Sequence, residues 1–305
     1  MALKDNLGFG MSLPHRTLDK VDMKSVRNVA QRAEALGFKD LWVTENAIDN
    51  DGYSFDPITI LTYAAAVTNT IGVGVSVVVL PQRHPVHVAH AYASLDYASG
   101  GRAILGVGIG RLEHYPHFGV PQERRIRRFN EQVQLIRRLW KEDVVDFQGE
   151  IFHFKGGIKM KPVQDPQPIW MGGTHPDAVR RSAQMADGWM GAVGQNTASF
   201  RDSVPILKEE LERLGRDVGK YPISKRVFMS VHENAKQARD EVNRWYSEAY
   251  HNPAQTDLAG VHGTPEQVRE QLEVMASYGA SHLLLNPVAR YDEQVEALAE
   301  VVGLK

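Results

Sequence analysis

Apolar positions along the chain follow two alternating patterns. Short runs of β-branched and other apolar residues, such as 71–81 (IGVGVSVVVLP), are typical of parallel strands that are buried on both faces. Between them lie longer segments whose apolar residues recur at helical spacing, as in the stretch 26–36 before Gly37. Four strands alternate with helical segments before Gly110, and this order predicts parallel β/α architecture.

The alternation continues to the end of the chain. The predicted strands are 7–13, 40–44, 71–81, 103–109, 168–172, 188–192, 227–232 and 282–286. The predicted helices are 26–36, 57–68, 85–98, 123–140, 176–186, 199–214, 235–249, 265–277 and 292–302. Asp56 is a plausible N-cap for the second helix, and Thr264 with Gln267 has the spacing of a capping box.

Eight strand-and-helix units without a linker predict a closed (β/α)8 TIM barrel that forms one domain over residues 1–305. An open, doubly wound sheet is the alternative, because a number of strands does not prove closure. The segment 144–154 alternates apolar and polar residues around Gln148-Gly149-Glu150. It predicts a hairpin inserted between the fourth and fifth strands.

Composition narrows the possible classes of function. The net charge of −2 and the pI near 6.6 give no reason to expect nucleic acid or an anionic membrane as a partner. The absence of cysteine excludes disulfides, thiolate nucleophiles, iron–sulfur clusters and cysteine-ligated zinc. The first residues, MALKDNLGFG, lack a basic region followed by a long apolar core, so we expect a cytoplasmic protein.

Functional groups of a β/α barrel lie at the carboxyl ends of its strands. The glycines of 106–110 (GVGIG) lie at the carboxyl end of the fourth strand, where they either let a flat ring lie against the backbone or leave room for neighbouring side chains. After the fifth strand, Gly172, Gly173 and Thr174 run into a helix that begins with proline, an arrangement that can bind phosphate. An ordinary turn capped by Thr174 is the alternative.

Histidines recur at every third position in two places, which raises the question of a metal site. The first set is His84, His87 and His90, and the second is His114 and His117. No carboxylate stands at matching spacing, and zinc or iron would require one that converges with the imidazoles. We therefore expect no metal.

Five segments resemble the bacterial luciferase-like oxidoreductases. They are LWVTEN at 41–46, GVSVVVLPQRHP at 74–85, LDYASGGRAILGVGIG at 95–110, KPVQDPQPIWMGG at 161–173 and ADGWM at 186–190. The resemblance covers nearly the whole chain, in order. It implies a TIM barrel, usually a homodimer, that binds reduced FMN or coenzyme F-420 (F420) at the carboxyl ends of the strands.

The resemblance also implies roles for particular residues. In deazaflavin members the third strand carries a bulge with a non-prolyl cis peptide behind the ring. By this match the bulge comprises Ser76, Val77 and Val78, with the cis bond at Ser76–Val77 or a neighbour. The other residues implied are Gly108, Ile109 and Gly110 beside the ring, and Gly172, Gly173 and Thr174 at the phosphate.

The catalytic positions depart from the family pattern. Many relatives have Asp-His where this chain has Glu45 and Asn46. An asparagine can donate a hydrogen bond to a ring carbonyl but cannot act as a general acid or base near neutral pH. His15, at the end of the first strand, is the candidate replacement, and a histidine that only packs or caps is the alternative.

Three functions follow from the resemblance. The first is hydride transfer between F-420 and a small organic substrate, with a separate F-420 reductase as a possible donor. The second is an FMNH2-dependent monooxygenase that relies on a separate flavin reductase. The third is a non-catalytic flavin-binding protein, because glycines at the strand ends fit a bound ring with or without turnover.

Overall fold

Parallel strands close into a barrel in the computed structural model, which describes residues 3–5, 7–48, 52–192 and 196–305. Within these residues the eight barrel strands are β1 (Gly8–Ser12), β3 (Asp40–Val43), β5 (Gly72–Val75), β7 (Ala103–Gly108), β10 (Ile169–Gly172), β11 (Gly188–Gly191), β12 (Ile223–Val231) and β14 (His282–Pro287). Each strand pairs with the next around the ring, and the pairing of β10 with β7 closes it. The predicted TIM barrel is therefore confirmed, and the open sheet is excluded.

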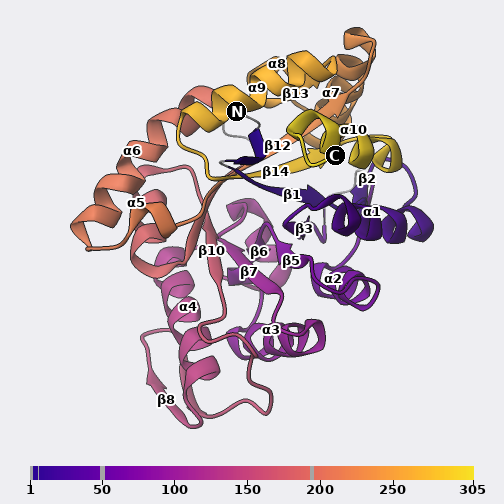
Figure 1. Ribbon diagram of the computed structural model, residues 1–305. Coiled ribbons are helices and arrows are strands. Elements are labelled where there is room, and N and C mark those ends of the chain that lie inside the picture. Colours follow the sequence, from indigo (N-terminus) through magenta and orange to yellow (C-terminus); the bar gives the residue numbers. More distant parts are fainter. Residues whose placement is uncertain (1–2, 6, 49–51, 193–195) are drawn as a thin grey trace.

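Helices surround the strands (Figure 1). They are α1 (Met23–Leu36), α2 (Pro57–Ala66), α3 (Pro85–Ser99), α4 (Arg125–Lys141), α5 (Pro176–Met185), α6 (Thr197–Arg213), α7 (Ala235–Tyr250), α9 (Pro265–Ser277) and α10 (Tyr291–Val302). Asp56 caps α2 by accepting from the backbone amides of Ile58 and Thr59, and Thr264 forms the predicted capping box with Gln267. None of the described helices is long and apolar enough to cross a membrane.

Smaller elements lie outside the set of eight barrel strands and the helices that surround them. They are β2 (Arg16–Thr17), which pairs with β4 (Tyr53–Ser54), β6 (Val78–Val79), β8 (Val145–Gln148), which pairs with β9 (His153–Gly156), β13 (Val261–Gly263), α8 (Gln255–Ala259), and the 3-10 helices η1 (Leu3–Asp5), η2 (Leu80–Gln82), η3 (Leu112–Phe118) and η4 (Val218–Lys220). The antiparallel pair β8–β9 lies between β7 and β10 in the chain, and Figure 1 places β8 beyond the end of α4.

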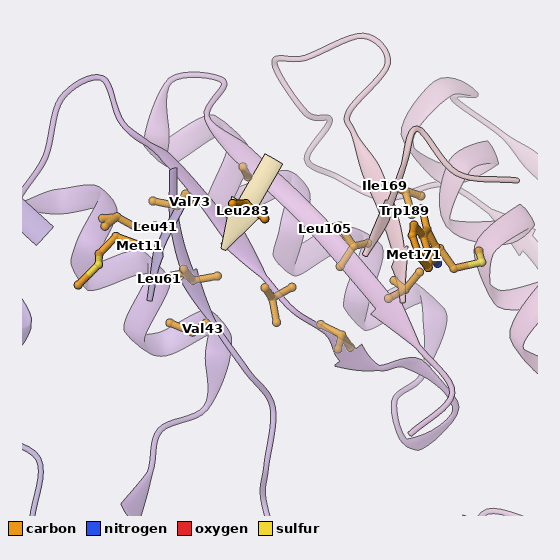
Figure 2. Packing of buried hydrophobic residues seen from close by; sticks show 14 of the residues in the cluster. Met11, Leu41, Val43, Leu61, Val73, Leu105, Ile169, Met171, Trp189 and Leu283 are labelled. Carbon is orange, nitrogen blue, oxygen red and sulfur yellow. The ribbon is translucent and has the colours of Figure 1, made fainter. Parts of the chain in front are cut away.

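The register of the sheet divides the side chains into two layers. Even-numbered residues pair with even-numbered residues around the barrel, for example Gly10 with Asp40, Trp42 with Gly74, and Ser224 with His282. Because paired residues point to the same face of a sheet, the even and odd positions form separate layers. The odd-numbered members face the helices, and Figure 2 shows several of them, including Met11, Leu41, Val73, Leu105, Ile169, Met171, Trp189 and Leu283.

The even-numbered layer fills the inside of the barrel. Trp42, Trp170, Met190 and Leu284 form a buried cluster separate from the main core. Glycines on neighbouring strands leave room for the indole rings. A Cβ added at Gly74 would lie 2.6 Å from Trp42, and one added at Gly188 would lie 2.8 Å from Trp170.

A buried polar network lies beside these tryptophans. Ser224 Oγ lies 2.7 Å from His282 Nδ1, and His282 Nε2 lies 3.0 Å from Asp40 Oδ1. Trp42 Nε1 donates to the same oxygen at 2.5 Å. The network satisfies the polar groups that the even-numbered layer buries, so we assign it to the stability of the barrel.

Two predicted strands differ from the structure. The seventh begins at Ile223 rather than at Val227, because Ser224 and Arg226 face the barrel interior and Lys225 is also buried. The predicted strand 71–81 is interrupted after Val75, and its chain pairs again with β7 only at Val78 and Val79. Before the gap Gly74 lies opposite Ile104, and after the gap Val79 lies opposite Gly108. After the gap the odd-numbered residues of this segment therefore belong to the interior layer, and the even-numbered ones to the outer layer.

Candidate active site

The interruption of the third barrel strand places Val77 inside the mouth of the barrel. The Ser76–Val77 peptide bond is cis, as the resemblance implies. Val77 packs against the interior cluster, whereas Val78 belongs to the outer core. A Cβ added at Gly108 would lie 2.5 Å from Val77 Cγ2, and one added at Gly172 would lie 3.1 Å from Val77 Cγ1. Val77 therefore lies over the ends of β7 and β10, where both strands lack side chains.

The glycines of 106–110 accommodate this third strand. A Cβ on Gly106 would collide with the carbonyl oxygen of Val75, and one on Gly110 would collide with the side chain of Val79. Gly110 also has a φ of 64°, which favours glycine. Ile109 is partly buried, and its carbonyl accepts a hydrogen bond from the Tyr115 hydroxyl at 2.6 Å. The close packing at Gly106 and Gly110 agrees with one of the two interpretations of this pattern, namely room for neighbouring residues.

The turn between β10 and α5 packs closely. A Cβ on Gly173 would lie 2.7 Å from the Cβ of Ala178, and the Gly173 carbonyl accepts from Trp189 Nε1 at 2.9 Å. His175, rather than Thr174, caps α5, because its Nδ1 accepts from the amide of Asp177 at 3.2 Å. Thr174 is exposed, and its hydroxyl makes no hydrogen bond to a described residue.

His15 is buried at the end of the first strand, with both ring nitrogens bonded. Nε2 accepts from the backbone N–H of Thr44 at 2.7 Å, so the proton must be on Nδ1, which donates to the carbonyl of Leu13 at 2.8 Å. Burial, together with the positive charges of Arg226 and Arg16, lowers the pKa of His15 from its ordinary 6.5 to about 3. His15 is therefore neutral over the physiological range and fixes the strand end around Thr44.

We expect the His15→Gln variant to lose less stability in acid than the wild-type protein. The unfolded chain takes up a proton at His15 below pH 6.5 and the folded chain does so only near pH 3, so the stability present above 6.5 is lost as pH falls. Between pH 8 and pH 5 this amounts to about 2 kcal/mol. Urea unfolding at both pH values measures it. Replacing the exposed His153 with glutamine is the control and should preserve the wild-type loss.

Glu45 belongs to an ion-pair network behind the bulge. Its carboxylate accepts from the backbone N–H of Val79 at 2.6 Å and from Arg83 Nε at 2.5 Å, and Arg83 Nη2 also donates to Asp56 at 2.6 Å. Burial raises the pKa of Glu45, and Arg83 opposes that effect. Asn46, the next residue, is partly exposed, and its side chain makes no hydrogen bond to a described residue. The network fixes the backbone around the bulge, and Asn46 is the free polar group beside it.

Arg226, on β12, is the residue of this region that the sequence did not single out. Its Nε and Nη2 donate to Asn286 Oδ1 at 3.0 and 2.5 Å, and its Nη1 donates to the carbonyl of Ser76 at 3.3 Å. It thus joins β12 and β14 to the bulge. One sequence feature could have identified Arg226 as an interior residue. It lies in alternation with Ser224 and Phe228, and this alternation continues the even-numbered pattern of the barrel interior.

Two further predictions concern neighbouring segments. Among the described residues, no group of three or more histidines, aspartates or glutamates is placed to hold a metal ion. His84 instead caps α3 by accepting from the amide of Val86 at 3.3 Å. The segment directly after the sixth predicted strand, 193–195, lies outside the described residues, and Asn196 caps α6.

Comparisons with known proteins agree with this architecture. The sequence profile described as luciferase-like monooxygenase matches residues 8–282. The chain is 29% identical over 224 residues to the F420-dependent glucose-6-phosphate dehydrogenase of Kineococcus radiotolerans, and the alignment covers 71% of this chain and 66% of that protein. The chain therefore spans slightly under two thirds of this relative's length.

Solved structures share the fold. An F420-dependent secondary alcohol dehydrogenase in complex with an F420–acetone adduct superposes with a TM-score of 0.84 at 18% identity, covering 98% of this chain and 99% of that one. A monooxygenase from Streptomyces bottropensis gives a TM-score of 0.84 at 22% identity, covering 96% and 98%. Because the family profile matches nearly the whole barrel, the chain belongs to the luciferase-like monooxygenase family.

Proposed function

We propose that this protein is an F-420-dependent oxidoreductase that transfers a hydride between the deazaflavin ring and a small organic substrate. The observation that carries the proposal is the position of Val77 over the bare ends of two strands, at Gly108 and Gly172. The partly buried Val77 side chain covers both glycines and presents an apolar surface at the mouth of the barrel, which suits one face of a flat ring. The preference for F-420 over FMN rests on sequence relatives that are named F420-dependent glucose-6-phosphate dehydrogenases.

The residues present fit this cofactor. Ser76, Val77 and Val78 would lie behind the ring, and Gly108, Ile109 and Gly110 would lie beside it. The N-terminus of α5, at Gly172, Gly173 and Thr174, would bind the phosphate through backbone amides. When bound, the coenzyme supplies a carbon that accepts or donates a hydride.

The protein's own residues orient the reactants. We assign Asn46 to binding, because its amide can donate a hydrogen bond to a carbonyl of the ring or of the substrate. Glu45 positions the bulge through Val79 and Arg83. His15, with its bonded ring nitrogens and lowered pKa, positions Thr44 and moves no proton in this proposal.

An FMNH2-dependent monooxygenase served by a flavin reductase is the second candidate. The structural similarity to the Streptomyces bottropensis monooxygenase motivates it, although at 22% identity that similarity concerns the fold alone. A flavin-binding protein without turnover would have the same surface at Val77. A homodimer and a cytoplasmic location remain predictions from the sequence.

A side-by-side titration distinguishes these functions. We expect the protein to bind F-420, which quenching of the coenzyme's fluorescence would measure. We also expect it to reduce F-420 in the presence of a secondary alcohol, which the loss of the coenzyme's absorbance would measure. Binding of FMN but not F-420, with oxygen consumption when a flavin reductase is added, would favour the monooxygenase. Binding without turnover across a panel of alcohols and enones would favour the non-catalytic protein.

The Thr174→Asp variant tests the phosphate site. A carboxylate at the exposed N-terminus of α5 repels a phosphate there, so we expect F-420 affinity to fall about tenfold or more, which corresponds to roughly 1.4 kcal/mol. The affinity for the phosphate-free deazaflavin should not change, and Thr174→Asn is the uncharged control. Gly173→Asp is a poorer choice because any Cβ at Gly173 meets Ala178. Equal losses for both ligands would place the phosphate elsewhere.

A further inference from the structure

Arg226 is a buried cation without an acidic partner. The residue is 8% exposed. Its hydrogen bonds go to two neutral acceptors, the side-chain oxygen of Asn286 and the carbonyl of Ser76. Among the residues that the structure describes, no carboxylate pairs with it. A guanidinium has five N–H groups, of which these bonds use three, so two remain, one on each Nη nitrogen.

The surroundings of Arg226 add positive charge and aromatic rings. Arg16 is 7% exposed, and its guanidinium lies 5.1 Å from the ring centroid of Tyr250 and donates to the Tyr250 hydroxyl at 3.1 Å. Arg226 itself lies 4.9 Å from the ring of Phe228. Besides burial, the groups that shift the pKa of Arg226 are Arg16, Tyr246, Tyr250 and Tyr291. The ring of His15 is close enough to both arginines for their charges to lower its pKa.

Burial lowers the pKa of Arg226 to about 10, so the guanidinium is still charged at neutral pH. A buried charge without a counter-ion is unfavourable, and a bound ligand of opposite charge would offset that cost. Two buried groups of the same cluster also lack a partner among the described residues, namely the Tyr246 hydroxyl and Trp245 Nε1. Both contact the ring of Phe228, at centroid distances of 5.7 and 5.3 Å.

We propose that Arg226 binds an oxyanion, a carboxylate or a phosphate, at the mouth of the barrel beside Val77. Guanidinium groups recognise these anions through paired N–H donors, and the two unused N–H groups of Arg226 are available for that purpose. Its bond to Ser76 places the anion next to the surface proposed for the ring. Assigning the anion to the substrate of hydride transfer rests on the proposed function, whereas anion binding itself does not.

Calorimetric titration of the unliganded protein with inorganic phosphate and with acetate tests the site. We expect binding to the wild-type protein and at least tenfold weaker binding to Arg226→Gln, which keeps a donor for Asn286. Arg226→Lys, which keeps the charge but not the paired donors, should be intermediate. Arg201→Gln is the matched control, because Arg201 also lies over an aromatic ring, Tyr278, but pairs with Asp202. It should bind the anions as the wild-type protein does.

Thermal unfolding shows whether the variants are folded. Phosphate should raise the melting temperature of the wild-type protein and of Arg201→Gln but not that of Arg226→Gln. Absence of anion binding to the wild-type protein, or equal affinities in all four proteins, would overturn the proposal. If Arg226→Gln does not fold, the comparison of Arg226→Lys with the wild-type protein decides in the same way.

A second titration identifies the source of the anion. If inorganic phosphate still binds to the F-420-loaded protein, the site serves the substrate, and this is the result we expect. If instead Arg226→Gln weakens binding of F-420 but not of the phosphate-free deazaflavin, the anion is the phosphate of the coenzyme. Either result supports an oxyanion at Arg226. Failure of F-420 to bind, with phosphate binding that still depends on Arg226, would refute the proposed function and leave this inference standing.

Discussion

Replacing Gly106 with alanine is expected to lower the free energy of unfolding by about 4 kcal/mol or more, which is exceptional for the addition of one methyl group. The added Cβ would collide with the carbonyl oxygen of Val75, a backbone atom of the neighbouring strand. Backbone cannot move aside as a side chain can, so the pairing of β5 with β7 must separate. Urea unfolding followed by circular dichroism measures the loss.

Gly74→Ala is the matched control, because its Cβ would meet a side chain instead. The nearest atoms belong to the ring of Trp42, at 2.6 Å. We expect a loss of about 1–3 kcal/mol, which is typical of overpacking. Trp42→Phe removes the outer ring and should recover part of the loss in Gly74→Ala, but it should recover none in Gly106→Ala. Wild-type stability of Gly106→Ala would show that β5 and β7 are not as close as described.

Replacing Arg83 with methionine is expected to cost about 3 kcal/mol near neutral pH, because it leaves the carboxylate of Glu45 buried without its cation. The side chain of Glu45 is 6% exposed and would retain the amide of Val79 as a donor. Arg83 itself is 29% exposed, so we place the loss at the lower end of the range for broken buried pairs. Chemical denaturation at several pH values provides the measurement.

The loss should shrink in acid. Burial already raises the pKa of Glu45, and without Arg83 the pKa must rise further. A carboxyl whose pKa is higher in the folded than in the unfolded chain destabilises the fold above that pKa, and the cost disappears as pH falls below the unfolded value. The double variant Glu45→Gln with Arg83→Met should recover part of the stability at neutral pH. A loss independent of pH, or a double variant no more stable than Arg83→Met, would contradict this account.

Most of the fold was predictable from the chain because each unit carries its own pattern. The run of apolar residues in 103–109, the caps at Asp56 and Thr264, and the helical spacing of 26–36 are local features, and the structure contains the expected elements at each. The seventh strand was predicted too short. Ser224, Lys225 and Arg226 are polar, and only the closed barrel buries them.

The candidate site was less predictable, because its geometry depends on contacts between distant strands. The glycines at 106–110 are visible in the sequence, but the atoms that require them belong to Val75, Val77 and Val79 on another strand. His15 was proposed as a candidate for proton transfer from its place at a strand end. Burial in the closed barrel leaves it neutral, and its bond to Thr44, 29 residues away in sequence, fixes its tautomer.

The sequence by itself determined the order of strands and helices, the family and the glycine-rich strand ends, because all of these follow from local pattern and residue type. Only the tertiary structure decided that the barrel closes between β7 and β10 and that Val77 lies inside its mouth. It also placed the charge of Arg226 beside Ser76, about 150 residues away in sequence. These features depend on the register between strands that are far apart in sequence, and that register is specified when their matching faces are buried together.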